Sequence, residues 1–339
     1  MRRAKTKRKR CLIIAEAGVN HNGRFDLAKK MIRVAAQVGA DYIKFQTFDP
    51  AELVTPQTPK AKYQQKATVA RESQRKMLEK LCLTRDQFRL LKKECLRQGI
   101  GFLSTAFDPG SLKFVESLRP DFHKISSGDI DNVPLLRQVA GYRRPVILST
   151  GMATMREVGE AVEILIQAGL SRRKMVVLQC HTEYPTHPRE ANLRVMDTFS
   201  RKFSVKTGLS DHTPGIFASL AAAARGAAVI EKHFTLDRSM RGPDHRASLT
   251  PKEMAMLVHG VREIGLCLGD GVKNPSLRER KIMPRVRRVL VATQPIRKGE
   301  KFSEKNMGLK RAGRGVPASH WDQWLGKRAG RDHRPDEAI

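Results

Sequence analysis

The sequence lacks a long hydrophobic run and a paired set of cysteines. No uninterrupted apolar stretch approaches the roughly 18 residues that a membrane-spanning helix needs, although 40% of the 339 residues are hydrophobic. The five cysteines are an odd number, lie far apart and include no Cys-x-x-Cys pair, a pattern typical of reduced thiols. We therefore expect a soluble, cytoplasmic protein with an ordinary core and no membrane partner.

Acidic residues are scarce: 34 Asp and Glu stand against 64 Lys and Arg, which gives a formal net charge of +30. Such a charge suits nucleic acid, an anionic membrane or acidic small substrates. The sequence has no helix-turn-helix pattern, no zinc-finger spacing and no aromatic-rich strand that would indicate nucleic-acid binding. We interpret the charge as the solvated surface of a protein that handles anions, without nucleic acid as a partner. A binding protein that retains polyanions without turnover is the alternative.

The length allows one large domain and one small one, because single domains usually stop at about 250 to 300 residues. All charged side chains of residues 1–10 are Lys or Arg. The apolar stretch that follows is short and soon reaches Glu16, so we expect a disordered basic arm rather than a secretion signal.

Short runs rich in Ile, Val, Leu and Phe alternate with amphipathic stretches, a pattern typical of βα units on a parallel sheet. The predicted strands lie at 11–15, 42–46, 100–104, 122–125, 145–149, 175–179, 203–208 and 227–231. A helix is predicted over 26–38, and helix starts with a capping pattern lie at Thr84, Thr154 and Thr250. Eight parallel strands in about 260 residues favour an α/β fold of the (β/α)₈ TIM-barrel type over a doubly wound sheet.

Active groups in such barrels come from the C-terminal ends of the strands and the loops that follow them. Nearly every predicted strand end is polar. Lys44 and Lys124 interrupt otherwise apolar strands, and a buried ammonium is costly unless an anion neutralises it. With the hydroxyls on neighbouring strands, they predict a site for phosphate or carboxylate; the alternative is that some hydroxyls only hold loops in place.

Two histidines, His212 and His233, follow the ends of the last two predicted strands. A catalytic metal needs few protein ligands and open positions, and neutral imidazoles suit Mn²⁺, Zn²⁺ or Fe²⁺. Their separation matches no local metal motif, so the pair alone decides nothing.

Eight ordered motifs resemble the sialic acid synthase family, which includes N-acetylneuraminate synthases, with legionaminic and pseudaminic acid synthases as relatives. The motifs are Ile13–Gly23, Lys44–Thr47, Lys124–Asp129, Leu148–Met152, Thr182–Pro185, Gly208–Thr213, Glu231–Phe234 and Gly242–His245. The resemblance covers about residues 11 to 339. It implies a TIM-barrel catalytic domain over 11–270, a linker over 271–286 and a small antifreeze-like (SAF) domain over 287–339.

The function that this resemblance implies is a transferase that condenses phosphoenolpyruvate with the open-chain aldehyde of N-acetylmannosamine, giving N-acetylneuraminate and phosphate. The alternative is a legionaminic acid synthase that uses a 2,4-diacetamido-6-deoxy-mannose. The resemblance also implies a homodimer with exchanged SAF domains.

Roles for individual residues follow from the same motif matches. His212 and His233 are expected to bind a divalent metal, Mn²⁺ by family preference, and Glu16 and Glu231 to stabilise developing charge or to direct water. The expected phosphoenolpyruvate ligands are Lys44, Thr105, Lys124, Ser127, Ser149 and Ser210. The expected sugar ligands are Gln46, Asp129, Tyr184, Asp244 and Arg311.

Three positions depart from the family's pattern. Asp129 stands where glutamate is commoner, His181 where related bacterial sequences often have asparagine, and Ala312 where proline is usual. The change at Asp129 shortens the reach toward the sugar by one methylene. The segments 182–185 and 242–249 resemble bacterial synthases that use unphosphorylated sugars more than they resemble the pseudaminic branch.

Overall fold

The computed structural model describes residues 10–60 and 72–339, which form two compact units, 1–269 and 270–339. Each unit is described by itself. The basic arm predicted over 1–10 lies, apart from Arg10, outside the described residues.

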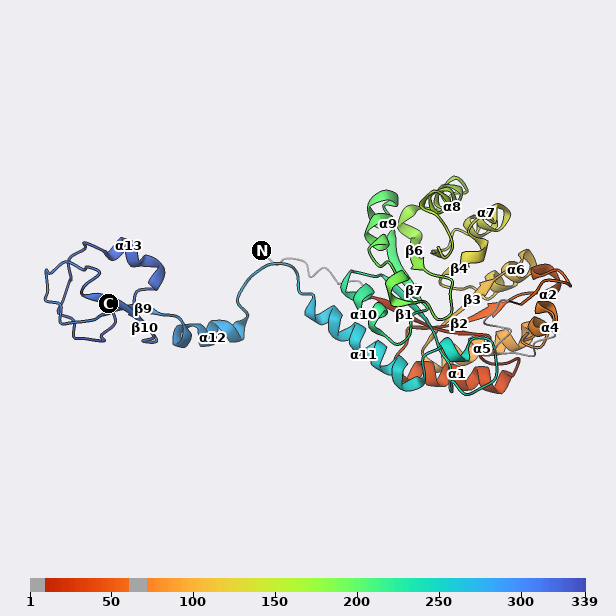
Figure 1. The fold of residues 1–339 in the computed structure, drawn as a ribbon, viewed down its shortest axis with the longest axis horizontal. Coiled ribbons are helices and arrows are strands. Elements are labelled where there is room, and N and C mark those ends of the chain that lie inside the picture. The colour runs from red at the N-terminus through yellow and green to blue at the C-terminus, as the bar shows by residue number, and fades with distance from the viewer. Residues whose placement is uncertain (1–9, 61–71) are drawn as a thin grey trace. The chain divides into compact units, whose positions relative to one another are not determined.

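The first unit is a closed barrel of parallel strands in the order β1 to β8, with helices around it (Figure 1). The strands are β1 Leu12–Gly18, β2 Tyr42–Thr47, β3 Gly101–Ala106, β4 His123–Ile125, β5 Val146–Ser149, β6 Met175–Cys180, β7 Lys206–Asp211 and β8 Val229–His233. The predicted TIM barrel is therefore confirmed.

The seventh and eighth strands begin later than predicted. The prediction for 203–208 was wrong at its start because Phe203 is the buried last residue of helix α9, Val195–Phe203, and Ser204 ends that helix with a positive φ of 54°. Aromatic and β-branched residues at 203 and 205 suit a strand as well as a buried helix end, so local pattern could not separate the two.

The described helices of the first unit surround the barrel, on its outside and, in the case of α4, beside its C-terminal mouth. They are α1 Phe25–Gln37, α2 Pro50–Leu53, α4 Gln74–Glu79, α5 Arg85–Gln98, α6 Pro109–Ser117, α7 Val133–Gly141, α8 Met155–Gln167, α9, α10 Phe217–Ala224 and α11 Pro251–Cys267. The capping boxes predicted at Thr84, Thr154 and Thr250 are all formed, each with its hydroxyl accepting from the backbone three residues on. These reciprocal bonds satisfy backbone N–H groups that a helix start leaves free.

The inside of the barrel is apolar at one end and polar at the other. Six buried residues form its apolar part: Ile14, Leu103, Ile147, Val176, Leu178 and Val229. Because side chains on a strand alternate between two faces, the residue two positions further along shares the same interior. Those residues are Glu16, Thr105, Ser149, Cys180 and Glu231. The strand period therefore directs polar side chains into the C-terminal mouth of the barrel.

The second unit is small. Strands β9 Val289–Ala292 and β10 Met307–Lys310 pair antiparallel, and a short helix, α13 Trp321–Trp324, packs on the same core. The predicted linker over 271–286 is not entirely irregular, because helix α12, Leu277–Val286, occupies its second half. A capping box between Ser276 and Glu279 starts that helix.

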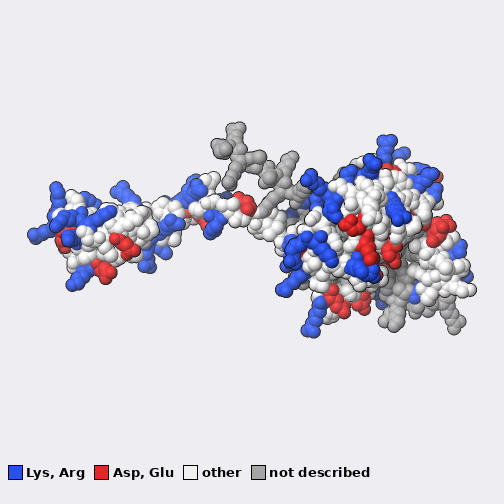
Figure 2. All heavy atoms as spheres, turned by 90° about the horizontal axis from the view of Figure 1, so that it is seen from above, with Lys and Arg blue, Asp and Glu red and all other residues white. Residues whose placement is uncertain are grey.

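None of the described helices is long and apolar enough to cross a membrane. Lys and Arg are distributed over the visible face of each unit and are interspersed with uncharged and acidic side chains (Figure 2). This distribution fits the interpretation of a basic solvated surface.

Gly208 on β7 tests the barrel packing. A Cβ there would lie 2.2 Å from the carbonyl oxygen of Val229 on the next strand, whereas a Cβ on Gly141, at the end of α7, would meet nothing within 4 Å. We expect Gly208→Ala to lower the free energy of unfolding by about 1–3 kcal/mol through overpacking. Gly141→Ala should leave it unchanged or raise it by about 0.5–1 kcal/mol. Urea unfolding followed by circular dichroism measures both, and equal stabilities would contradict the packing at Gly208.

Candidate active site

A cavity of about 300 Å³ opens at the C-terminal mouth of the barrel, a volume at the lower end for small-molecule sites. Most of the residues predicted from the sequence line it. They are Glu16, Lys44, Gln46, Thr105, Lys124, Ser127, Ser149, Tyr184, Ser210, His212, Glu231, His233 and Asp244. All eight strands, or the loops that follow them, contribute to this set.

Four buried charges form the floor of the cavity. The ammonium of Lys44 lies 3.2 Å from Glu16 and 3.5 Å from Glu231, and the ammonium of Lys124 lies 3.4 Å from Glu231. All four side chains are at most 7% exposed. Their mutual neutralisation compensates for a desolvation cost that otherwise reaches several kcal/mol per ion.

Neutral side chains hold this charged group in place. Lys44 donates to the Thr105 hydroxyl at 3.0 Å. Gln46 donates to Glu16, and Ser210 donates to Glu231, each at 3.2 Å. These bonds come from neighbouring strands, so the register of the barrel fixes where each charge lies.

The two glutamates have opposite protonation preferences. Burial raises the pKa of Glu16 to about 7, although Lys44 opposes this shift. Burial also acts against the charged form of Glu231, but Lys124 and Lys44 together hold the pKa of that carboxyl at about 2. At neutral pH, Glu231 is therefore a carboxylate, whereas Glu16 can accept or release a proton. Such a division between two neighbouring carboxyls is typical of acid–base sites.

Several buried polar atoms in the cavity have no hydrogen-bond partner among the described residues. They are the hydroxyl of Ser149, Oε2 of Glu231 and Nδ1 of His233. Buried polar atoms are rarely left without partners in folded proteins. Their common position on one cavity indicates a polar ligand there.

The imidazoles of His212 and His233 lie at the mouth of the cavity with ring centres 5.4 Å apart. Nδ1 of His212 donates to the backbone carbonyl of His181 at 2.6 Å, which leaves Nε2 as the basic nitrogen. Two imidazoles bonded to one ion at about 2.1 Å place their ring centres about 5 Å apart. The donor set therefore fits a divalent metal with open coordination positions, and the carbonyl contact is the kind that orients a metal-binding histidine.

Comparison with known proteins shows the family to which the chain belongs. A profile of the NeuB family matches residues 31–273. The chain belongs to the NeuB family. A SAF domain matches residues 287–339, so the predicted membership of the sialic acid synthase family and the predicted second domain type are both confirmed.

Individual NeuB-family relatives match over most of the chain. The N,N'-diacetyllegionaminic acid synthase of Campylobacter jejuni is 46% identical, over 98% of this chain and 99% of the relative. The enzyme of the same name from Legionella pneumophila is 40% identical, over 94% and 90%. A crystal structure of the N-acetylneuraminic acid synthetase of Leptospira borgpetersenii is 33% identical, with a TM-score of 0.71, over 81% of this chain and 90% of that one.

Two predicted site residues lie elsewhere. Asp129, the last residue of the 3₁₀ turn η1 Ser127–Asp129, does not line the cavity; its carboxylate accepts from Asn132 at 3.1 Å and it is nearly buried. Arg311 is exposed in the second unit, directly after β10. The roles of these two residues in sugar binding remain predictions.

The sequence analysis missed part of the cavity wall. Cys180 lines it, with Sγ 4.0 Å from Nδ1 of His212; its place two residues beyond Leu178 on β6 was the available signal. Met77, Leu78 and Leu81 form an apolar side. They belong to α4 and the turn after it, so no strand-end pattern could identify them.

The opposite pKa shifts of the two glutamates make a prediction for stability. Because the pKa of Glu16 is raised on folding, this residue contributes to the free energy of unfolding below about pH 4.5, and the contribution is lost as the pH rises to 7. Because the pKa of Glu231 is lowered on folding, its contribution to the free energy of unfolding is present above about pH 4.5 and is lost as the pH falls toward 2. Glu16→Gln should therefore be increasingly more stable than the wild type between pH 5 and 8, by about 1–3 kcal/mol. Glu231→Gln should cost about 3–5 kcal/mol at pH 8, because it leaves buried lysines unpaired.

Urea unfolding followed by far-ultraviolet circular dichroism measures these differences. Tryptophan fluorescence would report on the second unit instead, because both tryptophans lie there. A Glu16→Gln variant that is as unstable at pH 8 as Glu231→Gln would show that Glu16 is a charged structural partner instead.

Proposed function

We propose that this chain is an N,N'-diacetyllegionaminic acid synthase. It condenses phosphoenolpyruvate with a 2,4-diacetamido-6-deoxy-mannose in its open-chain form and releases phosphate. Two relatives of that name match nearly the whole chain at 46% and 40% identity, against 33% for the N-acetylneuraminic acid synthetase structure. N-acetylmannosamine, the substrate first expected from the sequence, is therefore the second candidate.

The observation that carries an enzymatic function is the buried pair of lysines beside a serine hydroxyl that has no hydrogen-bond partner among the described residues. A dianionic phosphate and a carboxylate need compact cations and hydroxyl donors. Lys44 and Lys124 supply the charge, and Ser149, with its free hydroxyl, supplies a donor. A protein that only retains polyanions at its surface has no reason to bury such a group.

The reaction joins the enol of phosphoenolpyruvate to the sugar aldehyde and breaks the carbon–oxygen bond to phosphate. A carbon–carbon bond forms between the enol methylene and the aldehyde carbon, and the aldehyde oxygen takes up a proton. The adjacent enol carbon becomes cationic, and water then adds to it and loses a proton. The new hydroxyl then gives its remaining proton to the departing phosphate as the carbon–oxygen bond breaks, which yields the ketone. Glu231, ionised at neutral pH, faces the developing cation. Glu16, with a pKa of about 7, holds or moves the proton of the attacking water.

His212 and His233 hold a divalent metal, Mn²⁺ by the family's preference. Such an ion, when bound, polarises the sugar aldehyde and makes it a better electrophile. The hydrogen bond from His212 to the His181 carbonyl keeps that imidazole in one tautomer. Tyr184, whose ring centre lies 4.1 Å from that of His212, lines the same cavity and is our candidate for contact with the sugar.

The apolar wall favours the diacetamido sugar. Met77, Leu78 and Leu81 line the cavity together with Val19. A second acetamido methyl and a 6-deoxy methyl find apolar contacts there, whereas N-acetylmannosamine presents hydroxyls at the corresponding positions. Each methyl group buried is worth about 0.8 kcal/mol. Gln46 and Asp244 remain as polar partners for the sugar's hydroxyl groups.

A panel of sugars tests this assignment. With phosphoenolpyruvate and Mn²⁺ present, phosphate release should show a kcat/KM for the 2,4-diacetamido sugar at least about tenfold above that for N-acetylmannosamine, in line with one or two additional buried methyl groups. N-acetylglucosamine serves as the control sugar. A higher kcat/KM for N-acetylmannosamine would return the function to N-acetylneuraminate synthesis.

The proposed assembly is a homodimer with exchanged SAF domains. Six apolar side chains in the segment from Leu266 to Val286 are 48–77% exposed, namely Leu266, Leu268, Val272, Leu277, Ile282 and Val286. Exposed apolar side chains at the end of α11 and along α12 support the proposal that a partner covers these helices. In this dimer Arg311 reaches the sugar in the partner's barrel, where its planar guanidinium binds hydroxyl or acetamido oxygens.

Complementation between two inactive variants tests the exchange. Arg311→Ala subunits have a sound barrel, and His212→Ala subunits have a sound second unit. If Arg311 acts on the partner's barrel, each mixed dimer contains one complete site, and equal mixing should recover about a quarter of wild-type activity. A mixture that stays inactive after subunit exchange, verified by native mass spectrometry, would place Arg311 in its own subunit's site. An active Arg311→Ala homodimer would remove this residue's role, with Arg314 as the next candidate.

A further inference from the structure

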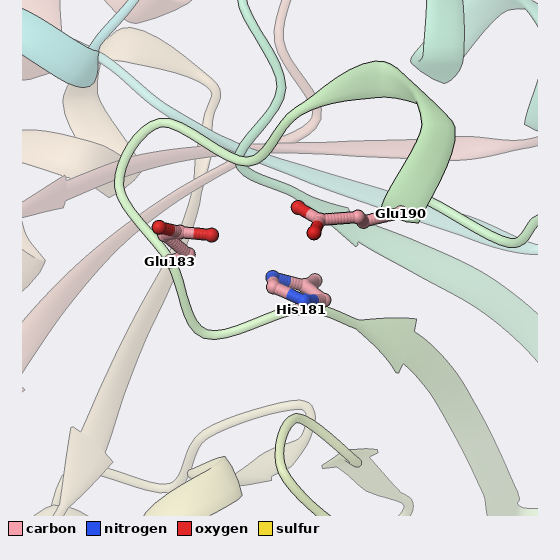
Figure 3. A group of neighbouring side chains, drawn as sticks. All are labelled: His181, Glu183 and Glu190. Atoms are coloured by element: carbon pink, nitrogen blue, oxygen red, sulfur yellow. The ribbon is translucent and has the colours of Figure 1, made fainter.

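The loop after β6 brings three metal-binding side chains together outside the cavity already described. His181 follows the strand directly, Glu183 lies two residues on, and Glu190 ends the 3₁₀ turn η3 Pro188–Glu190. One potential ligand atom from each lies within 4.8 Å of the others. In Figure 3 the imidazole and both carboxylates point into the same space between the loop and η3.

Hydrogen bonds within the loop hold these positions. The Thr186 hydroxyl donates to the carbonyl of Glu183 at 2.8 Å. Gln179 on β6 donates to the carbonyl of Ala191 at 3.1 Å, which ties the strand to the end of η3. The His187 imidazole accepts from the backbone N–H of Arg189 at the start of that turn. These hydrogen bonds therefore hold the loop in this conformation without a ligand.

The two carboxylates are unusual in this basic chain. Most Asp and Glu side chains of the barrel that lie near a charged group form an ion pair with Lys or Arg, as Glu94 and Glu116 do. Among the described residues, no hydrogen bond or ion pair involves the side-chain oxygens of Glu183 or Glu190, although the chain carries 30 more basic than acidic residues. Two neighbouring carboxylates and an imidazole nitrogen without a cation between them form an incomplete site.

We propose that His181, Glu183 and Glu190 bind a divalent transition-metal ion, with Zn²⁺ the best fit to one nitrogen and two oxygen ligands. Ligand atoms on one such ion lie about 3.4 Å apart. Because both glutamates are exposed and His181 is half-buried, side-chain rotation closes the remaining distance. Exposed positions leave room for water as a further ligand.

This loop site is separate from the barrel site but adjoins it. The carbonyl of His181 accepts the hydrogen bond from His212, and Cys180 and Thr182, on either side of His181, line the active-site cavity. An ion in the loop therefore fixes the segment that orients His212.

Zinc stoichiometry tests the proposal. The metal-stripped, full-length protein is dialysed against Zn²⁺, and bound metal per chain is measured by mass spectrometry. His181→Asn and Glu190→Gln should each bind one ion fewer than the wild type. His212→Ala should also lose one ion, from the barrel, and the His181→Asn/His212→Ala double variant should lose both.

His187→Asn is the matched control, because it changes an exposed histidine of the same loop and keeps a side-chain oxygen that can accept from Arg189. It should bind as much Zn²⁺ as the wild type. Wild-type stoichiometry in both His181→Asn and Glu190→Gln would overturn the loop site, as would loss of an ion in His187→Asn alone. Loss in Glu190→Gln with a wild-type circular dichroism spectrum separates lost ligation from misfolding. Failure of the barrel assignment shows separately, as a His212→Ala variant that keeps every ion.

Discussion

Two lysines and two glutamates neutralise one another inside the barrel, and the site depends on this arrangement. None of the four could be buried singly without a cost of several kcal/mol. Together they leave the pKa of Glu16 near neutrality and that of Glu231 low, because Glu231 faces both ammonium groups and Glu16 faces mainly Lys44. The difference in pKa between the carboxyls therefore arises from position, since the two side chains are chemically identical.

The barrel supplies these positions through strand alternation. Six apolar side chains fill one end of the interior, and Glu16, Thr105, Ser149, Cys180 and Glu231 follow on the same five strands toward the C-terminal mouth. Hydrophobic burial at one end thus stabilises the barrel, and charged side chains can occupy the other end. The loops add what strands cannot: an apolar side from α4 and the ring of Tyr184. In the proposed function, discrimination between sugars depends on these loop and helix residues.

The region beyond β6 combines both kinds of contribution. Its first residue, His181, uses a backbone carbonyl to orient His212 and a side chain to face two loop carboxylates. A substitution in this loop can therefore change metal binding at one site while the backbone contact to the other remains. This separation makes the loop a suitable place for differences between members of one family.

The sequence by itself determined the barrel, its capping boxes and most of the site, because strand period, helix caps and ordered motifs are local. Lys44, Lys124 and the two histidines could be recognised at strand ends for this reason. The tertiary structure alone decided which charges pair, since pairing depends on register across strands far apart in the chain. It also decided that Phe203, which suits a helix as well as a strand, belongs to α9, so that β7 begins later than predicted. In the folded chain Asp129 bonds to Asn132, and Glu190 lies close to His181 although a loop separates them in the sequence. These outcomes depend on distances between segments, which no local pattern specifies.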